Sequence, residues 1–96
     1  MLEKEVEQYL VTQVSKHGGL CLKFVSPGRA GVPDRIVLHK GNVYFVELKS
    51  PTGTVRKSQK IMFRRFEYHG IYVHVVHSKE EVNDFIRSID DRLSAT

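Results

Sequence analysis

Two charged side chains stand where charge is costly, at the end of an apolar segment. Glu47 and Lys49 close the run Asn42 to Ser50, NVYFVELKS, and Leu48 separates them. The run is rich in β-branched and aromatic residues and is bounded by turn residues, which predicts a buried strand. Side chains alternate along a strand, so Glu47 and Lys49 point to one face and Leu48 to the other. Such ionised groups are costly there unless they are paired or bind a metal.

Asp34 is the third candidate and comes before the strand that carries Glu47 and Lys49. It opens the run Arg35 to His39, and the turn residues His39-Lys40-Gly41-Asn42 separate this run from the next. The two runs are therefore predicted to form an antiparallel hairpin, with Asp34 beside Glu47 at its open end. Two carboxylates suit a hard cation such as Mg²⁺ or Mn²⁺, and a lysine can hold or activate a water. Without Asp34, a solvated ion pair on an edge strand would explain Glu47 and Lys49 equally well.

Pro33-Asp34 followed by Glu47-Leu48-Lys49 resembles the signature of the PD-(D/E)XK nucleases. More narrowly, Phe24 to Asp34 and Tyr44 to Lys49 resemble the stand-alone virus-type replication-repair nuclease (VRR-NUC) domains of phages and bacteria. The likeness extends from the first predicted helix to Ile89. It implies an α/β, restriction-endonuclease-like fold with an αβββαβ core, a mixed four-stranded sheet flanked by helices and an extra C-terminal helix.

The resemblance also implies a divalent-metal-dependent DNA endonuclease that uses Mg²⁺ or Mn²⁺. Asp34, Glu47 and the carbonyl of Leu48 would bind the metal, and Lys49 would orient or deprotonate the attacking water. Stand-alone members resemble Holliday-junction resolvases, which implies a homodimer that cuts branched DNA such as a four-way junction. Two alternatives stay open: a non-catalytic nucleic-acid-binding module of the same fold, and an interaction protein whose charges are surface decoration.

Leu2 to His17 is predicted to be the first helix, ended by Gly18-Gly19, with an apolar stripe formed by Leu2, Val6, Leu10 and Val14. Glu3 and Glu7 border this stripe. Acidic residues near a helix N-terminus often only complement the macrodipole. Related nucleases carry a helical glutamate that completes the metal site, and the resemblance implies Glu7 for this role, with Glu3 in reserve.

The segment from Ser26 to Pro33 is predicted to be a loop because it is rich in glycine and proline. Such a loop is structural by default. Its place beside Asp34 also favours a mobile flap, in which Arg29 contacts DNA phosphate and Ser26 contacts the scissile phosphate or a metal-bound water.

A second helix is predicted from Arg56 or Ser58 to His69, with Met62, Phe63 and Phe66 on its apolar side. Gln59 falls on that side. It is either a satisfied border residue or, as the resemblance implies, a residue that faces the active site. The opposite flank is basic and is either a solvated surface or a phosphate-binding stripe formed by Arg56, Lys57, Lys60 and Arg64.

Two further strands are predicted, from Leu20 to Val25 and from Ile71 to Val76, the latter parallel to its neighbour through a crossover helix. Ser78 and Glu81 form a capping box that opens a last helix, whose packing side is Val82, Phe85, Ile86 and Ile89. Leu93 to Thr96 are expected to fray.

At 96 residues the chain is expected to be one domain, residues 1–96. A net charge of +4 favours a polyanionic partner. The lone Cys21 excludes an internal disulfide and is expected to be buried and inert. No membrane span or signal peptide is evident, so we expect an intracellular, cytoplasmic protein with no membrane partner. No nucleotide-binding loop or zinc ligand set is evident either, so we expect no nucleotide cofactor. The resemblance implies a bacterial or phage-infected host.

Overall fold

The structure is a computed structural model and describes residues 1–91. Its elements follow one another in the order α1 (Glu3–Lys16), β1 (Leu20–Lys23), β2 (Arg35–His39), β3 (Asn42–Leu48), α2 (Lys57–Tyr68), β4 (Val73–Val76) and α3 (Lys79–Asp90). Within residues 1–91, no helix is long and apolar enough to cross a membrane.

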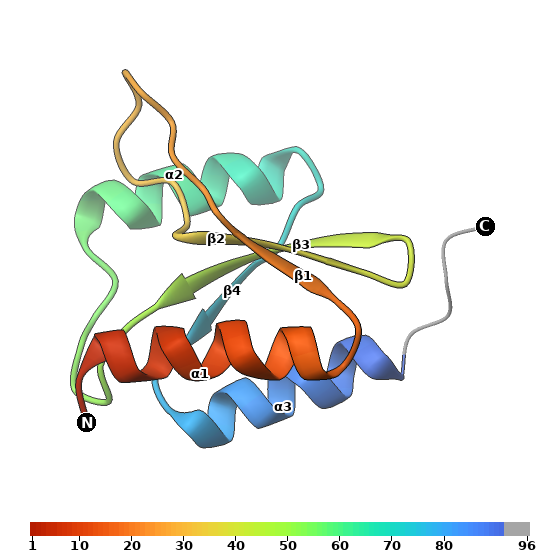
Figure 1. Cartoon of the computed structure of the whole chain (residues 1–96). Coiled ribbons are helices and arrows are strands. Elements are labelled where there is room, and N and C mark those ends of the chain that lie inside the picture. The colour runs from red at the N-terminus through yellow and green to blue at the C-terminus, as the bar shows by residue number, and fades with distance from the viewer. Residues whose placement is uncertain (92–96) are drawn as a thin grey trace.

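The four strands form one mixed sheet in the order β1-β2-β3-β4 (Figure 1). β1 pairs with β2 and β2 with β3 in antiparallel fashion, whereas β3 and β4 are parallel and are joined through α2. A parallel pair needs such a crossover connection. The predicted αβββαβ core with a closing C-terminal helix is confirmed.

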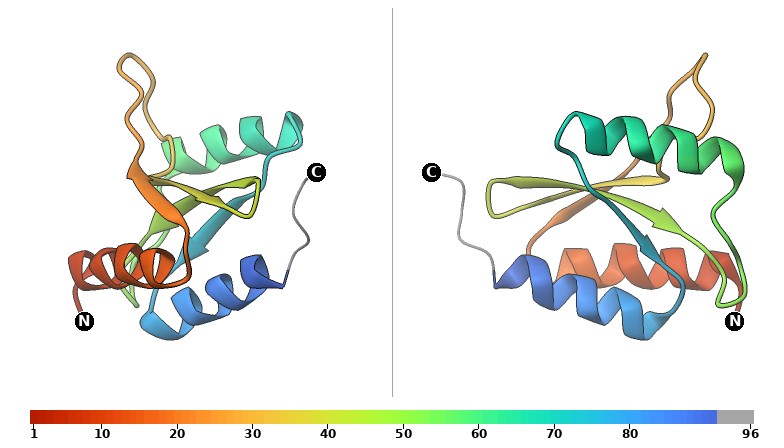
Figure 2. Two further views of the ribbon diagram at one scale, coloured as in Figure 1. Left: turned by 45° about the vertical axis from the view of Figure 1, so that its right-hand side comes forward. Right: turned by 180° about the vertical axis from the view of Figure 1, so that it is seen from behind.

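Helices cover the two faces of the sheet unequally: α1 and α3 pack on one face and α2 on the other (Figure 2). The main core lies on the α1 and α3 side, where the buried cluster consists of Val6, Leu10, Val14, Val37, Tyr44, Val46, Leu48, Val76, Val82, Phe85, Ile86 and Ile89. On the α2 side the ring of Phe45 packs against Phe24 and Phe66, with centroids 5.6 Å and 5.1 Å away. Residues 43, 45 and 47 of β3 share this second face.

A two-residue turn sets the register of the β2–β3 hairpin. Lys40 and Gly41 both have positive φ angles, 49° and 77°, as a type I′ turn requires. The resulting ladder pairs Arg35 with Val46 at its open end. Continuing the ladder by one residue places Asp34 opposite Glu47, as the hairpin prediction requires.

Several predicted boundaries differ from the structure. Leu2 is not part of the buried stripe, because it is the N-cap of α1 and is 66% exposed. β1 ends at Lys23 rather than Val25, and β4 begins at Val73 rather than Ile71. In these omitted ends the side chains of Val25, Ile71 and Tyr72 are exposed.

The capping box of α3 is only half formed. The Ser78 hydroxyl accepts from the Glu81 N–H at 3.1 Å, as predicted. The Glu81 carboxylate, however, accepts from the N–H of His77 at 2.9 Å and not from that of Ser78. The same carboxylate oxygen also lies 3.0 Å from Nδ1 of the His77 ring. This second contact favours the N–H of His77 over that of Ser78 as the donor. The predicted packing side of α3 is buried, whereas Leu93 to Thr96 lie outside the described residues.

Candidate active site

Asp34 is fixed by its main chain to β1 and by its side chain to β3. Its carbonyl accepts from the Phe24 N–H at 2.9 Å, and its Oδ2 accepts from the Leu48 N–H at 3.1 Å. β2 has already ended at this point, so the carboxylate takes the place of the next ladder acceptor. Within a strand the N–H and C=O of one residue point to the same side, so the Leu48 carbonyl is also directed toward Asp34.

Glu47 is buried beside this carboxylate, with 1% of its surface exposed. Its Oε2 accepts from Nε2 of Gln59 at 2.6 Å and lies 3.2 Å from Nζ of Lys49. Its Oε1 is also buried and has no hydrogen-bond partner among residues 1–91. A buried carboxylate oxygen without a partner is costly, and a bound cation is one way to satisfy it.

The pKa of Glu47 is raised above its ordinary value. Burial is the largest cause, because it disfavours the charged form, and the nearby charge of Asp34 adds to it. Hydrogen bonding and charge from Lys49, together with the amide of Gln59, oppose this shift without cancelling it. The two carboxylates therefore repel each other in the absence of a cation.

Gln59 connects Glu47 to the first turn of α2. The side chain is 3% exposed. Its Nε2 donates to Glu47, and its Oε1 accepts from the Arg56 N–H at 2.9 Å, which caps the helix. Gln59 thus has its hydrogen-bonding groups satisfied at the border of the apolar side of α2, and it also faces the end of β3 that carries Glu47. Both predicted alternatives therefore describe part of its environment.

Lys49 continues β3 past its last ladder residue. Its N–H donates to the Val76 carbonyl at 3.0 Å, which holds the main chain against β4. The side chain is only 7% exposed and is paired with Glu47. Both members of this ion pair are desolvated, so neither behaves as a surface charge.

Gly31 brings the loop between β1 and β2 against the start of α2. Its φ is +88°, and a Cβ atom at this position would lie 2.5 Å from the main-chain oxygen of Ser58. Only glycine permits so close an approach with this backbone conformation. The loop is therefore packed next to Gln59 and extends beyond it, past α2 (Figure 1).

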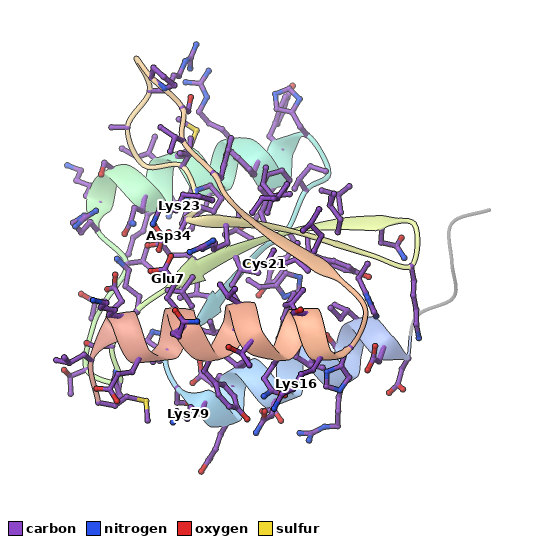
Figure 3. The ribbon with its side chains drawn as sticks, in the orientation of Figure 1. Glu7, Lys16, Cys21, Lys23, Asp34 and Lys79 are labelled. Atoms are coloured by element: carbon purple, nitrogen blue, oxygen red, sulfur yellow. The ribbon has the colours of Figure 1, made fainter. Side chains whose placement is uncertain are left out.

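Glu7 projects from α1 toward the strand end where Asp34 lies (Figure 3). Its Oε2 accepts from Nε of Arg35 at 2.9 Å and from Nζ of Lys23 at 3.2 Å. Partial burial alone would raise the pKa of this carboxyl, but the hydrogen bonds and charges of Arg35 and Lys23 outweigh it and lower the pKa. Glu7 is thus kept ionised and is engaged by two cations. The structure brings Asp34, Glu47, Lys49 and Gln59 together, with Glu7 as an adjacent and separately paired group.

The sequence matches a known family over most of its length. A family model described as the VRR-NUC domain matches residues 2–80. The chain belongs to the VRR-NUC family. A solved structure titled "VRR_NUC domain" is similar with a TM-score of 0.82 and 33% identity, over 88% of this chain and 94% of that one.

A curated relative, "Putative nuclease p44" of Acyrthosiphon pisum secondary endosymbiont phage 1, is 56% identical over 50 residues. The matched segment covers 51% of this chain and 54% of the relative. The VRR-NUC chain therefore spans about half the length of the curated relative that it matches.

The predicted DNA-contacting residues of this VRR-NUC domain lie on two sides of α2. Arg29 is exposed in the loop, whereas Ser26 is half-buried and its carbonyl accepts from the Arg29 N–H at 3.2 Å. The basic residues of α2 are also exposed, and two of them line a cavity that faces β4. The predicted DNA-contacting residues of this helix and its N-cap, Arg56, Lys57, Lys60 and Arg64, are all exposed, as is Arg65.

Sequence reasoning missed Lys23 and Arg35, the two partners of Glu7. A signal was present, since both basic residues stand at strand ends next to the predicted carboxylates, and the register places them directly opposite each other. Among residues 1–91 of the VRR-NUC domain, no group of three or more His, Cys, Asp or Glu side chains could hold a metal.

Cys21 was predicted to be buried. It packs against the core but is only partly buried. Burial raises the pKa of its thiol; the charge of Arg35 opposes this shift and that of Glu7 adds to it. A thiol with a raised pKa is a poor nucleophile.

Proposed function

We propose that this VRR-NUC domain is a divalent-metal-dependent endonuclease that hydrolyses phosphodiester bonds in DNA. The observation that carries the proposal is the buried Oε1 of Glu47, which has no hydrogen-bond partner in the described part of the chain and is held beside Asp34 and Lys49 at one strand end. A solely structural ion pair would satisfy both carboxylate oxygens with donors. The family name and the name of the phage relative support the same activity.

The donor set fits a hard cation such as Mg²⁺ or Mn²⁺. Asp34, Glu47 and the carbonyl of Leu48 supply oxygen ligands on one side of the hairpin end, and Mg²⁺ commonly takes only one or two carboxylates. Glu7 would join this set through water, because its own oxygen is engaged by Arg35. When bound, the cation would act as a Lewis acid toward the phosphate.

The protein's own groups divide the remaining work. As an ammonium, Lys49 would orient the attacking water at Nζ and offset the negative charge that develops on the phosphate oxygens. Alternatively, after giving up its own proton, neutral Lys49 would accept the proton of that water. Gln59 would orient Glu47 through the 2.6 Å hydrogen bond. Ser26 would contact the scissile phosphate from the loop.

DNA would be held by its backbone rather than read by its bases. Arg29, Arg56, Lys57, Lys60 and Arg64 are all exposed cations, which suit phosphate contacts. Structure-selective cutting, as a homodimer on branched or four-way DNA, follows from the resemblance and forms part of the proposal. A two-fold dimer would match the symmetry of a four-way junction.

The direct test is cleavage of linear, flapped and four-way DNA with Mg²⁺ or Mn²⁺. We expect Asp34→Ala and Lys49→Ala to abolish cleavage while circular dichroism shows a folded protein. Lys16→Ala, at the exposed end of α1, serves as the matched control and should cleave normally. Full activity in either site variant would refute the assignment. DNA binding without cleavage by the unaltered protein would favour the non-catalytic binding module.

A further inference from the structure

A second binding feature lies next to the carboxylates, in a cavity that the proposed hydrolysis does not use. The cavity has a volume of about 350 Å³ and is bounded by β3, α2, the segment before β4 and the loop that carries Arg29. Its walls are apolar and partly aromatic and its rim is basic. The lining residues are Arg29, Phe45, Met62, Arg65, Phe66, His69 and Ile71.

The cavity and the candidate active site share the same two elements. Phe45 is two residues before Glu47 on β3, so both side chains face α2, with main chains about 7 Å apart. On α2, Gln59, Met62 and Phe66 are spaced at three and four residues and lie along one side of the helix. Two pairs of side chains therefore follow each other between β3 and α2. The first is Gln59 with Glu47 at 2.6 Å, and the second is Phe66 with Phe45 at a centroid distance of 5.1 Å.

The chemistry of the lining selects one kind of occupant. Aromatic and thioether side chains favour a flat, weakly polar group that stacks, and guanidinium groups at the rim favour an anion attached to it. A nucleobase joined to its phosphate has both properties. Paired bases inside a duplex do not expose their faces, so the occupant must be unpaired.

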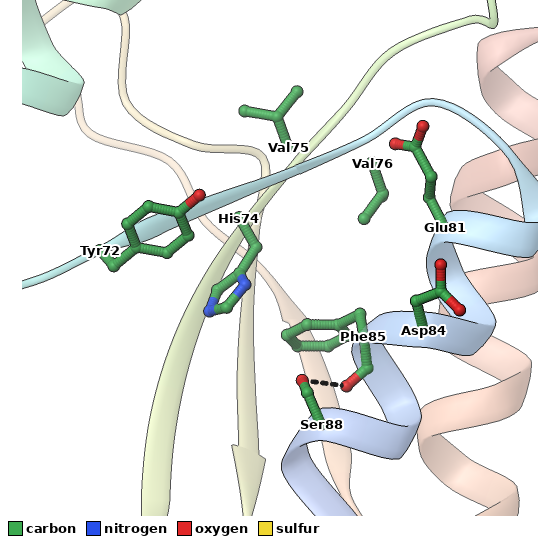
Figure 4. A pocket seen from close by; sticks show the side chains of 8 residues that line it. All are labelled: Tyr72, His74, Val75, Val76, Glu81, Asp84, Phe85 and Ser88. Atoms are coloured by element: carbon green, nitrogen blue, oxygen red, sulfur yellow. Dashed lines mark hydrogen bonds between the residues drawn. The ribbon is translucent and has the colours of Figure 1, made fainter.

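A comparison within the molecule strengthens the argument from charge. Another cavity, of about 370 Å³, lies between β4 and α3 and also contains aromatic rings, those of Tyr72 and Phe85 (Figure 4). Its other wall carries the carboxylates of Glu81 and Asp84, which would repel a phosphate. The cavity beside β3, by contrast, combines rings with two arginines, and its lining contains no carboxylate.

We propose that the cavity lined by Phe45 and Phe66 binds one unpaired nucleobase of the DNA substrate, next to the phosphodiester bond that is cut, with Arg29 and Arg65 on its phosphates. This inference rests on the proposed nuclease function and narrows the substrate to DNA with an unpaired nucleotide at a branch. The enzyme would select such branches through base stacking and not through base identity.

The test compares two flapped duplexes that differ at the unpaired nucleotide beside the branch, which is either an adenosine or an abasic sugar-phosphate. Both carry the same number of phosphates, so phosphate contacts cancel. Binding is measured by fluorescence anisotropy in EDTA, which prevents cleavage. We expect the base to tighten binding by about 5- to 150-fold, the range typical of one base stacked on an aromatic side chain.

Phe66→Leu keeps an apolar side chain and removes the ring, and should bring the ratio of the two dissociation constants close to one. Tyr68→Leu is the control, since Tyr68 is on the same helix, is exposed and does not line the cavity. It should leave the ratio unchanged. If the unaltered protein cleaves flapped DNA with Mg²⁺ but binds both duplexes equally, the base-binding site is refuted and the nuclease proposal stands. A protein that neither cleaves nor binds DNA refutes both.

Discussion

Replacing Gln59 with leucine tests the link between the helix and the buried carboxylate. The substitution keeps an apolar stem of similar length and removes two hydrogen bonds, one to Glu47 at 2.6 Å and one from the Arg56 N–H at 2.9 Å. The first involves a buried charge and is worth about 1.5–3 kcal/mol. The second is a helix cap, worth about 0.5–2 kcal/mol. The extra buried methyl returns about 1 kcal/mol, so we expect a net loss of about 1–4 kcal/mol in the free energy of unfolding.

Urea-induced unfolding followed by tyrosine fluorescence measures this loss, because the chain has four tyrosines and no tryptophan. Gln8→Leu, at an exposed position of α1, is the matched control and should change the stability by less than about 0.5 kcal/mol.

A double-mutant cycle identifies the source of the loss. In a Glu47→Gln background the acceptor is neutral, so Gln59→Leu should cost about 1 kcal/mol less than in the unaltered protein. Equal costs in both backgrounds would show that the charged hydrogen bond does not contribute as the geometry requires.

Two further predictions concern the loop and the titration of the site. Gly31→Ala should destabilise the fold by about 1–3 kcal/mol more than Gly28→Ala does. Both glycines have a positive φ, but only at Gly31 would the added Cβ contact the main chain of Ser58. Equal melting temperatures of the two variants would contradict this prediction. The raised pKa of Glu47 means that the folded protein keeps a proton that the unfolded chain has lost, so the stability of the metal-free protein should fall as pH rises from about 4.5 through the raised pKa. Glu47→Gln should remove this part of the pH dependence. Urea titrations from pH 4 to 8 measure the free energy of unfolding of both proteins, and an equal decline in the variant would contradict the prediction.

Much of the fold was predictable because the local signals agree with one another. The apolar runs of β2 and β3, separated by the turn residues His39 to Asn42, predicted the hairpin and with it the position of Asp34 opposite Glu47. The side-chain spacing of α2 likewise predicted that Gln59 lies on the apolar side. The positions of Asp34, Glu47 and Gln59 follow from strand alternation and helix periodicity, and both can be identified in the sequence.

The features that sequence could not supply depend on competition between tertiary partners. Glu7 was expected near a metal, but the sequence does not show that Arg35 and Lys23 reach it first. The half-formed capping box of α3 has the same origin, because His77 offers both its N–H and its ring to Glu81. Helix and strand patterns indicate which face a side chain occupies, and not which of several donors on that face it selects.

The type I′ turn at Lys40 and Gly41 has an effect well beyond its own residues. Five residue pairs separate it from the carboxylates, yet the side-chain period of two makes their facing depend on it. One inserted residue there would slide β3 by a single step and turn Glu47 toward α1, away from Gln59. The relative positions of Asp34 and Glu47 therefore depend on the turn at the opposite tip of the hairpin. The length of that turn is as constrained as the identity of the two carboxylate residues.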